Sequence, residues 1–362
     1  MKAALLLAPR DVRVEKVPDP TLGAPAFPAW QSPAGEALVR VRAAGICGSD
    51  LHRYRGHRDL GPQASPILGH EVAGEVVSVS AGVTKVKPGD RIAVEPLIGC
   101  GACAMCMSGA YNICPDLKFI GAQYPGGFAE LVKAPELNLF VLPDSVSYED
   151  ATLVDGFAVA VHALRRVPVQ PWEDVLILGG GAIGLEMLQM VRLAGARRVI
   201  ISVTHPVQGE TARGLGADVV LNAREVDVAA AVRDLTGGRG VDVAFETVGG
   251  EGKTLAQAIP AIARQGRLCV IGGFDHPQLV DFNTTLRREI DVRFAFSYGR
   301  WQGQSEFGHA LDLLASGRLS ARPLITHRYP LAEAGEAFRA ADDKASYASI
   351  KVLVLQSNDP SG

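Results

Sequence analysis

The chain has 362 residues, of which 48% are hydrophobic and 21% are charged, and its formal net charge is −3. This length predicts two domains, each with its own core. The weak negative charge argues against a basic surface that would bind nucleic acid or an anionic membrane. No apolar stretch approaches the roughly 20 residues that a membrane-spanning helix needs. Charged residues follow the short apolar start directly, so we interpret residues 1–9 as a β-strand and not a signal peptide, and we expect a cytoplasmic protein.

Up to about residue 155, short β-type runs alternate with Gly, Pro and Asp, which predicts a partly open β-barrel. The strands that we expect there are 37–42, 71–79, 91–94 and 130–134. A helix is predicted over 151–166, and short apolar strands then alternate with helices. Such alternation is typical of a doubly wound parallel sheet covered on both faces. The predicted strands are 175–178, 199–202, 219–221, 241–245 and 268–271, and the predicted helices are 182–194, 207–215, 226–235 and 252–263.

After residue 296 the alternation stops. One more helix is predicted over 304–316, and the alternating segment 349–355 is predicted to be a strand that returns to the first domain. The expected domains are therefore 1–155 together with 299–362, and 156–298. The stretch 18–33 contains five prolines and is predicted to be a surface excursion, whose purpose the sequence does not indicate.

Four of the six cysteines are clustered with spacings of two, two and seven residues: Cys100, Cys103, Cys106 and Cys114. Four thiolates at such spacings can form a closed tetrahedral shell around Zn²⁺, which has no open position for chemistry and is therefore structural. The alternative, a set of buried core cysteines, is disfavoured by the polar, Gly-rich surroundings.

A second group of potential zinc ligands is dispersed: Cys47, and His70 followed by Glu71. Cysteine and histidine are good zinc ligands, and a catalytic site needs only three protein groups. Alone, however, each has a simpler interpretation, a small buried hydrophobe for Cys47 and a structural histidine for His70.

A glycine-rich loop, GGGAIG at 179–184, follows a predicted strand and precedes a predicted helix, as a dinucleotide-binding fingerprint requires. We assign the tight turn to Gly179, the close approach of the pyrophosphate to Gly181, and strand–helix packing to Gly184. The alternative is a plain glycine turn.

Together these residues resemble the zinc-containing medium-chain dehydrogenase/reductase superfamily, and in particular its sorbitol, butanediol and threonine dehydrogenases. The resemblance rests on GICGSDLH at 45–52, GHE at 69–71, the four-cysteine loop ending YNICP at 111–115, the glycine loop, and LITH at 324–327. It implies a GroES-like β-barrel catalytic domain with an inserted Rossmann domain. It also implies a homodimer or homotetramer with a catalytic and a structural zinc ion in each chain.

The resemblance assigns roles to individual residues. Cys47 and His70 match the catalytic zinc ligands, and Glu71 matches a neighbouring carboxylate that ligates directly in some relatives. Asp155 falls at the remaining ligand position, although Gly156 stands where a proline is usual, and a solvated loop aspartate is the alternative for Asp155. Ser49 and His52 match a relay that accepts the proton of the substrate hydroxyl while hydride passes to the nicotinamide; an ordinary surface histidine is the alternative for His52. The cofactor contacts that we expect are Gly179, Gly181, Ala182, Ile183, Gly184, Val203, Thr204, His205, Val248, Gly272 and Ser297.

The sequence departs from the NAD-using relatives at Val203, where they place an acidic residue that binds the adenosine ribose and repels a 2′-phosphate. Thr204 and His205 could hydrogen-bond such a phosphate, so we favour NADP slightly over NAD. No arginine follows directly after the strand, however, as we would expect in an enzyme committed to NADP.

The sequence predicts oxidation of a secondary alcohol or polyol, or reduction of the matching ketone. The alternatives are a threonine-type amino-alcohol or sugar- or cyclitol-derivative dehydrogenase and, from another class, a non-catalytic dinucleotide-binding scaffold. Such a scaffold would be expected to have lost Cys47, Ser49 or His70, and all three are present.

Overall fold

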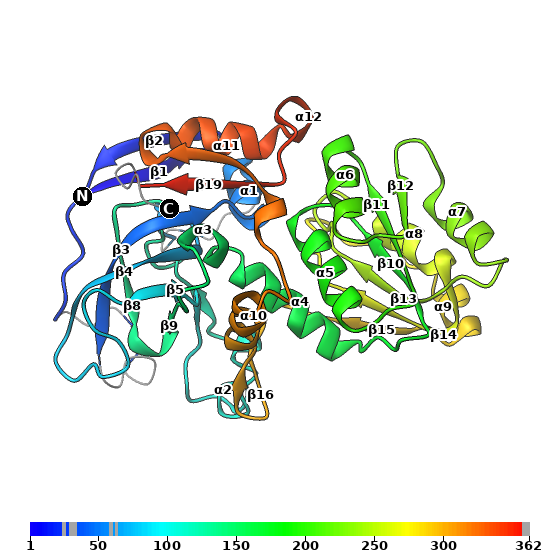
Figure 1. The fold of residues 1–362 in the computed structure, drawn as a ribbon, viewed down its shortest axis with the longest axis horizontal. Coiled ribbons are helices and arrows are strands. Elements are labelled where there is room, and N and C mark those ends of the chain that lie inside the picture. Colours follow the sequence, from blue (N-terminus) through cyan, green and yellow to red (C-terminus); the bar gives the residue numbers. More distant parts are fainter. Residues whose placement is uncertain (24–26, 29–34, 58–60, 62–63, 357–362) are drawn as a thin grey trace. The chain divides into compact units, whose positions relative to one another are not determined.

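The computed structural model describes residues 1–23, 27–28, 35–57, 61 and 64–356. They form two compact units, one made of residues 1–155 and 299–362 and the other of residues 156–298 (Figure 1). Much of the proline-rich stretch, residues 24–26 and 29–33, lies outside the described residues. Among the described residues, no helix is both long and apolar enough to cross a membrane.

The first unit is built on a seven-stranded sheet in the order β18-β19-β3-β4-β5-β9, with β8 also paired to β3. Its pairs are antiparallel except for β18 with β19. This sheet confirms the predicted GroES-like β-rich fold, and its last strand in the sequence, β19, pairs with β3 (Figure 1). The strands are β3 (Glu36–Gly45), β4 (Glu71–Val79), β5 (Arg91–Val94), β8 (Leu131–Pro135), β9 (Leu139–Val141), β18 (Ile325–Pro330) and β19 (Lys351–Leu355).

Alternation along the strands produces the core of this unit. Val39 and Val41 on β3 are fully buried, whereas Arg40 between them is exposed. Helix α11 (Ala334–Asp342) covers part of the core, where Phe338 packs against Tyr54 at the end of α1 (Gly48–Tyr54) with ring centroids 5.2 Å apart. The packed core therefore fixes the position of α1, which carries several of the predicted site residues.

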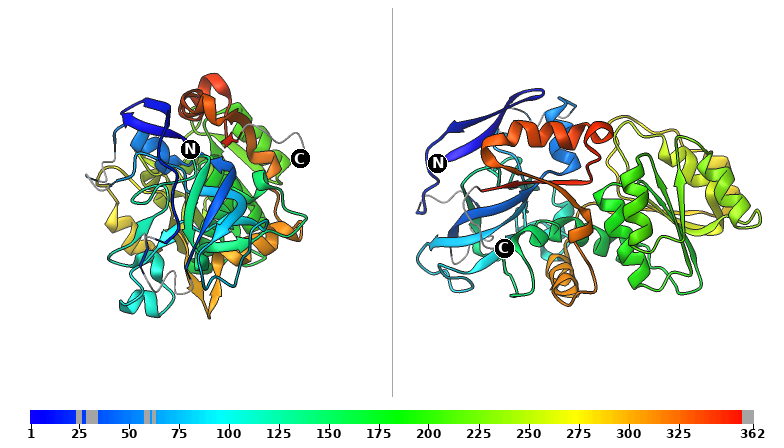
Figure 2. Two further views of the ribbon diagram at one scale, coloured as in Figure 1. Left: turned by 90° about the vertical axis from the view of Figure 1, so that its left-hand side faces the viewer. Right: turned by 45° about the horizontal axis from the view of Figure 1, so that its top comes forward.

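The second unit is a six-stranded parallel sheet in the order β12-β11-β10-β13-β14-β15, which confirms the predicted Rossmann-type fold. Helices α7 and α8 contribute to the apolar cluster on one face of the sheet, and α5 and α6 cover the other face, as Figure 2 shows. The strands are β10 (Asp174–Leu178), β11 (Arg198–Val203), β12 (Val219–Asn222), β13 (Val241–Glu246), β14 (Ile262–Val270) and β15 (Asp291–Phe294). The helices are α4 (Val154–Arg166), α5 (Ala182–Leu193), α6 (Pro206–Gly214), α7 (Val228–Leu235), α8 (Thr254–Ala261) and α9 (Phe282–Arg288).

Several elements differ from the sequence prediction, among them α9, β18 and α11, which were not predicted. The edge strand β15 was not predicted, because its residues are mostly exposed and polar residues alternate with apolar ones over only four positions. The predicted helix 151–166 is divided into α3 (Tyr148–Ala151), capped by the Ser147 hydroxyl, and α4.

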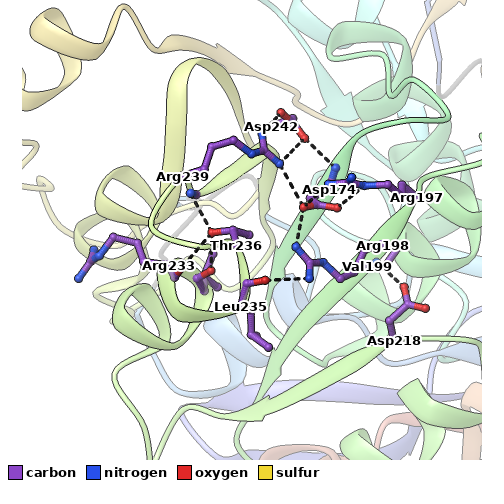
Figure 3. A network of polar contacts seen from close by, with 12 residues as sticks. Asp174, Arg197, Arg198, Val199, Asp218, Arg233, Leu235, Thr236, Arg239 and Asp242 are labelled. Carbon is purple, nitrogen blue, oxygen red and sulfur yellow. Dashed lines mark hydrogen bonds and ion pairs between the residues drawn. The ribbon is translucent and has the colours of Figure 1, made fainter.

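A polar network joins the amino ends of three central strands (Figure 3). The fully buried carboxylate of Asp174 accepts hydrogen bonds from Arg197 at 2.8 and 3.0 Å, from Arg198 at 2.6 Å and from Arg239 at 3.2 Å. Burial alone would raise the pKa of Asp174, but the guanidinium groups lower it below its usual value. The network therefore stabilises the edge of the sheet opposite to the glycine-rich loop.

Candidate functional site

The pairing of β3 with β4 brings Cys47 and His70 together. Gly45 at the end of β3 pairs with Glu71 at the start of β4, so the residues just beyond these ends are neighbours. One ligand atom from each of Cys47, His70 and Glu71 lies within 4.8 Å of the others. The cluster combines a thiol, an imidazole and a carboxylate, a donor set that fits a catalytic zinc site.

Carboxylates lie on both sides of the His70 ring. Asp155 Oδ2 is 4.0 Å from Nε2, and Asp50 Oδ1 is 3.7 Å from Nδ1. Burial alone would lower the pKa of His70, but Cys47 and Asp50 raise it well above its usual value. The surroundings of His70 are therefore strongly anionic, as expected of a site that holds a cation.

Asp50 is a site residue that the sequence analysis missed. Its Oδ2 accepts the backbone N–H of Cys47 at 3.0 Å, and its other oxygen faces His70. Asp50 thus lies where it can orient both ligands, as carboxylates around zinc-bound histidines commonly do. The sequence indicated this role only indirectly: Asp50 lies three residues after Cys47, where it completes the N-terminal capping of α1.

Glu71 is bound to a partner that the sequence analysis also missed. Lys351 Nζ lies 2.6 Å from each of its carboxylate oxygens, and both side chains are buried. The pair needs Gly45, since a Cβ atom at that position would lie 2.0 Å from Glu71 Oε2. The charge of Glu71 is therefore already neutralised, whereas that of Asp155 faces His70 directly.

The predicted relay residues lie on α1, immediately after Cys47. Ser49 is exposed and His52 is half-buried, one helical turn further along. Because the two residues are three positions apart on a helix, their side chains are neighbours on one face of α1.

The four cysteines of the loop converge. One Sγ atom from each of Cys100, Cys103, Cys106 and Cys114 lies within 4.8 Å of the others, and none of them forms a disulfide. The backbone N–H groups of Ala102 and Cys103 lower the pKa of Cys100 to about 7, whereas burial raises the pKa of Cys106 to about 12 and also raises that of Cys114. Positive φ angles of 73° at Gly101 and 86° at Gly109 allow the tight loop. This arrangement fits a closed four-thiolate zinc site.

This cysteine loop is tied to the barrel by a buried contact that was not predicted. The Tyr111 hydroxyl donates a hydrogen bond to Glu95, which follows β5. Burial raises the pKa of Glu95 to about 7, while the hydrogen bond from Tyr111 and the charges of Arg300 and Lys85 act in the opposite direction.

In the second unit, the three fingerprint glycines have different surroundings. A Cβ atom at Gly179 would lie 2.7 Å from Val248 Cγ2, and one at Gly184 would lie 1.9 Å from the Gly179 oxygen, so the fold itself needs these two glycines. At Gly181 no atom lies within 4 Å of such a Cβ, and no side chain caps the following helix α5, which begins with Ala182 and Ile183. The open backbone and the helix N-terminus fit a pyrophosphate group.

The other predicted cofactor contacts follow the carboxyl ends of neighbouring strands. Val203 ends β11 and is buried beside Gly180, where a Cβ atom would lie 2.6 Å from Val203 Cγ1. The N–H groups of Thr204 and His205 both donate to Gln208 Oε1, at 3.1 and 3.2 Å. Val248, Gly272 and Ser297 follow β13, β14 and β15 respectively.

Comparison with known proteins gives two family matches. Residues 33–144 match the alcohol dehydrogenase GroES-like domain, and residues 182–316 match the zinc-binding dehydrogenase family. Sorbitol dehydrogenase of Bacillus subtilis is 34% identical over 94% of this chain and 93% of its own length. L-threonine 3-dehydrogenase of Pyrococcus abyssi is 37% identical over 82% of this chain and 84% of its own. A structure of a zinc-binding dehydrogenase target from Sinorhizobium meliloti, bound to NADP, has 30% identity and a TM-score of 0.86, covering 98% of both chains.

Proposed function

The chain belongs to the zinc-containing medium-chain dehydrogenase/reductase superfamily as a zinc- and nicotinamide-dependent alcohol or polyol dehydrogenase, and from this premise we propose that it oxidises a secondary hydroxyl group of a polyol with NADP. The observation that carries the proposal is the convergence of Cys47 and His70 beside the anionic Asp155. The family matches confirm the superfamily that the motifs predicted. The roles of the individual residues are proposals.

We assign the catalytic zinc to Cys47, His70 and Asp155. Asp155 completes the set because its carboxylate faces His70, whereas that of Glu71 is held by Lys351. Three protein ligands are the number that a catalytic zinc site needs. A second zinc ion is assigned to the four cysteines of the 100–114 loop, where it stabilises the loop.

When bound, the catalytic zinc supplies Lewis-acid chemistry that lowers the pKa of the substrate hydroxyl. The residues of the chain position the reactants and move the proton. Asp50 holds the His70 ring in orientation, Ser49 accepts the hydroxyl proton and His52 passes it toward solvent. The N-terminus of α5 would hold the pyrophosphate of the cofactor, whose nicotinamide would supply the hydride acceptor when bound.

NADP is the proposed cofactor because β11 ends in Val203. No carboxylate stands there to bind the ribose hydroxyls or to repel a 2′-phosphate. The chain is further proposed to work as a cytoplasmic homodimer or homotetramer, a state that light scattering on the purified protein would measure.

The threonine-type alternative has support in the sequence similarity to the Pyrococcus enzyme. A screen of sorbitol, other polyols, diols, threonine and inositol derivatives, each with NAD⁺ and with NADP⁺, separates the two activities. Faster turnover of threonine than of every polyol would overturn the polyol proposal. A strong preference for NAD⁺ would overturn the proposed use of NADP.

The zinc assignment is tested by metal analysis of purified variants. We expect a zinc ion at each of the two sites of the wild type, loss of one ion together with activity in Cys47→Ser, and loss of the other in Cys106→Ser. Cys269→Ala is the matched control, because this buried cysteine belongs to the second unit whereas both clusters belong to the first, and it should keep both ions. Zinc near zero in the wild type, or undiminished in Cys47→Ser, would contradict the assignment.

A further inference from the structure

The turn that follows β12 lies beside the turn that follows β11. The two strands are parallel neighbours in which Val203 pairs with Asn222, and the N–H of Ala223 donates to the Val203 oxygen at 2.9 Å (Figure 1). Arg224 is the second residue after β12, so its backbone stands next to the position where an acidic residue would mark an NAD-using enzyme. The sequence places this arginine 21 positions beyond Val203, and only the strand pairing brings the two together.

An anion at the end of β11 would have to be bound by side chains. The backbone N–H groups of Thr204 and His205, which directly follow β11, are already bonded to the side chain of Gln208. Gln208 is buried, so this contact is a fixed part of the turn. The hydroxyl of Thr204 is on an exposed residue and available to a ligand, but a neutral hydroxyl supplies no charge.

Arg224 can supply that charge. Its residue is exposed, and its backbone N–H donates to Asn222 Oδ1 at 3.1 Å, which fixes the turn. Within the part of the chain that the structure describes, its guanidinium group has no hydrogen bond or ion pair. The adjacent carboxylate, that of Glu225, is held by the Asn222 amide at 2.6 Å. By contrast, Arg192 and Arg198 of the same unit are paired with Asp218 and Asp174.

We propose that Arg224 binds the 2′-phosphate of NADP, with Thr204 as a second donor, and thereby sets the cofactor preference. The inference rests on the proposed use of NADP. A guanidinium group offers two parallel N–H donors to a phosphate and stays charged at any working pH, which makes arginine better suited than lysine to this contact. Arg224, in the turn after the neighbouring strand β12, thus replaces the arginine that is missing directly after β11.

Binding of nucleotide fragments tests the proposal without turnover. Calorimetric titration compares adenosine 2′,5′-bisphosphate, which carries the 2′-phosphate, with 5′-AMP, which lacks it. We expect the wild type to bind the bisphosphate more tightly. Arg224→Leu should weaken bisphosphate binding roughly tenfold to a hundredfold, as loss of a charged hydrogen bond does, and should leave 5′-AMP binding unchanged. Arg224→Lys should fall between the two.

The matched control is Arg287→Leu, which removes the same charge from exposed helix α9 at the other side of the sheet and should change neither titration. A wild type without preference for the bisphosphate would overturn the proposed use of NADP and this inference with it. A wild-type preference that survives in Arg224→Leu would overturn only the role of Arg224. Equal weakening of both nucleotides in Arg224→Leu would also overturn it, because the effect would not depend on the 2′-phosphate.

Discussion

Lys351 Nζ lies 2.6 Å from both carboxylate oxygens of Glu71, and the two side chains are only 4% and 2% exposed. The pair joins the last strand of the chain to the first residue of β4, directly after His70. A buried carboxylate without a partner would be costly here. The ion pair therefore links β19 and β4, the two strands that flank β3, and compensates one of the negative charges around the proposed zinc site.

This relationship predicts strong coupling between the two residues. Lys351→Met should lower the free energy of unfolding by about 3–5 kcal/mol, because it leaves Glu71 charged and buried. The double variant Glu71→Gln/Lys351→Met should lose less than the sum of the single variants by roughly 1–3 kcal/mol. Urea unfolding measures these values. Arg328→Met, which breaks an exposed pair with Glu149, is the control and should cost at most about 1 kcal/mol. Additive losses would contradict the coupling.

The two candidate carboxylate ligands should respond differently to substitution. Asp155→Ala should lose the catalytic zinc and the activity, because it removes a proposed ligand. Glu71→Gln should retain the metal, since that carboxylate is engaged by Lys351. Zinc content and dehydrogenase rate, measured on the same preparations, check both statements. The assignment would be reversed by a Glu71→Gln protein without catalytic zinc and an Asp155→Ala protein that keeps it.

The sequence predicted the central strands of the fold more accurately than the edge strand β15. β4 and β5 were predicted with their observed bounds, because their apolar runs are bounded by Gly, Pro and Asp. The short edge strand β15 has a weaker pattern, since few of its residues are buried, and it was missed.

In the candidate site, the sequence predicted the residues that are close together in the chain but not their partners from distant strands. The four cysteines and the glycine loop are local in sequence, so their spacing predicted which residues converge. The partners of these residues come from distant strands. Lys351 is 280 positions from Glu71, and Arg224 approaches Val203 only through the pairing of β11 with β12. No periodicity in one sequence indicates such contacts.

Glu95 predicts a dependence of stability on pH. Its pKa is raised to about 7 from a usual 4.5, mainly by burial, so its contribution to stability is complete below the usual value and is lost as the pH rises through about 7. Glu95→Gln resembles the protonated form and should be more stable than the wild type at about pH 8, by roughly 1–3 kcal/mol. Unfolding curves between about pH 5 and about pH 8 measure the effect. The exposed Glu333→Gln should follow the wild type, and parallel pH profiles for Glu95→Gln and wild type would refute the prediction.

The Asp174 network in Figure 3 predicts a stability effect without a catalytic one. Asp174→Asn leaves three guanidinium groups without their shared carboxylate, and two of them, those of Arg197 and Arg239, are about half exposed, so water partly compensates. We therefore expect a loss of about 1–3 kcal/mol in the free energy of unfolding near neutral pH. Nicotinamide cofactor affinity should stay unchanged, because the network lies at the amino ends of the strands and the glycine loop at their carboxyl ends.

The sign of the pH dependence is opposite to that of Glu95. The folded-state pKa of Asp174 is below its usual 3.8, so its stabilising effect is complete above that value and is lost as the pH falls through the lower, folded-state pKa. The difference between wild type and Asp174→Asn should therefore be largest near neutral pH and shrink in acid below about pH 4. Chemical unfolding at several pH values, with the exposed Asp234→Asn as control, measures this difference. A gap that widened in acid, or a change in cofactor affinity, would show that the carboxylate acts in some other way.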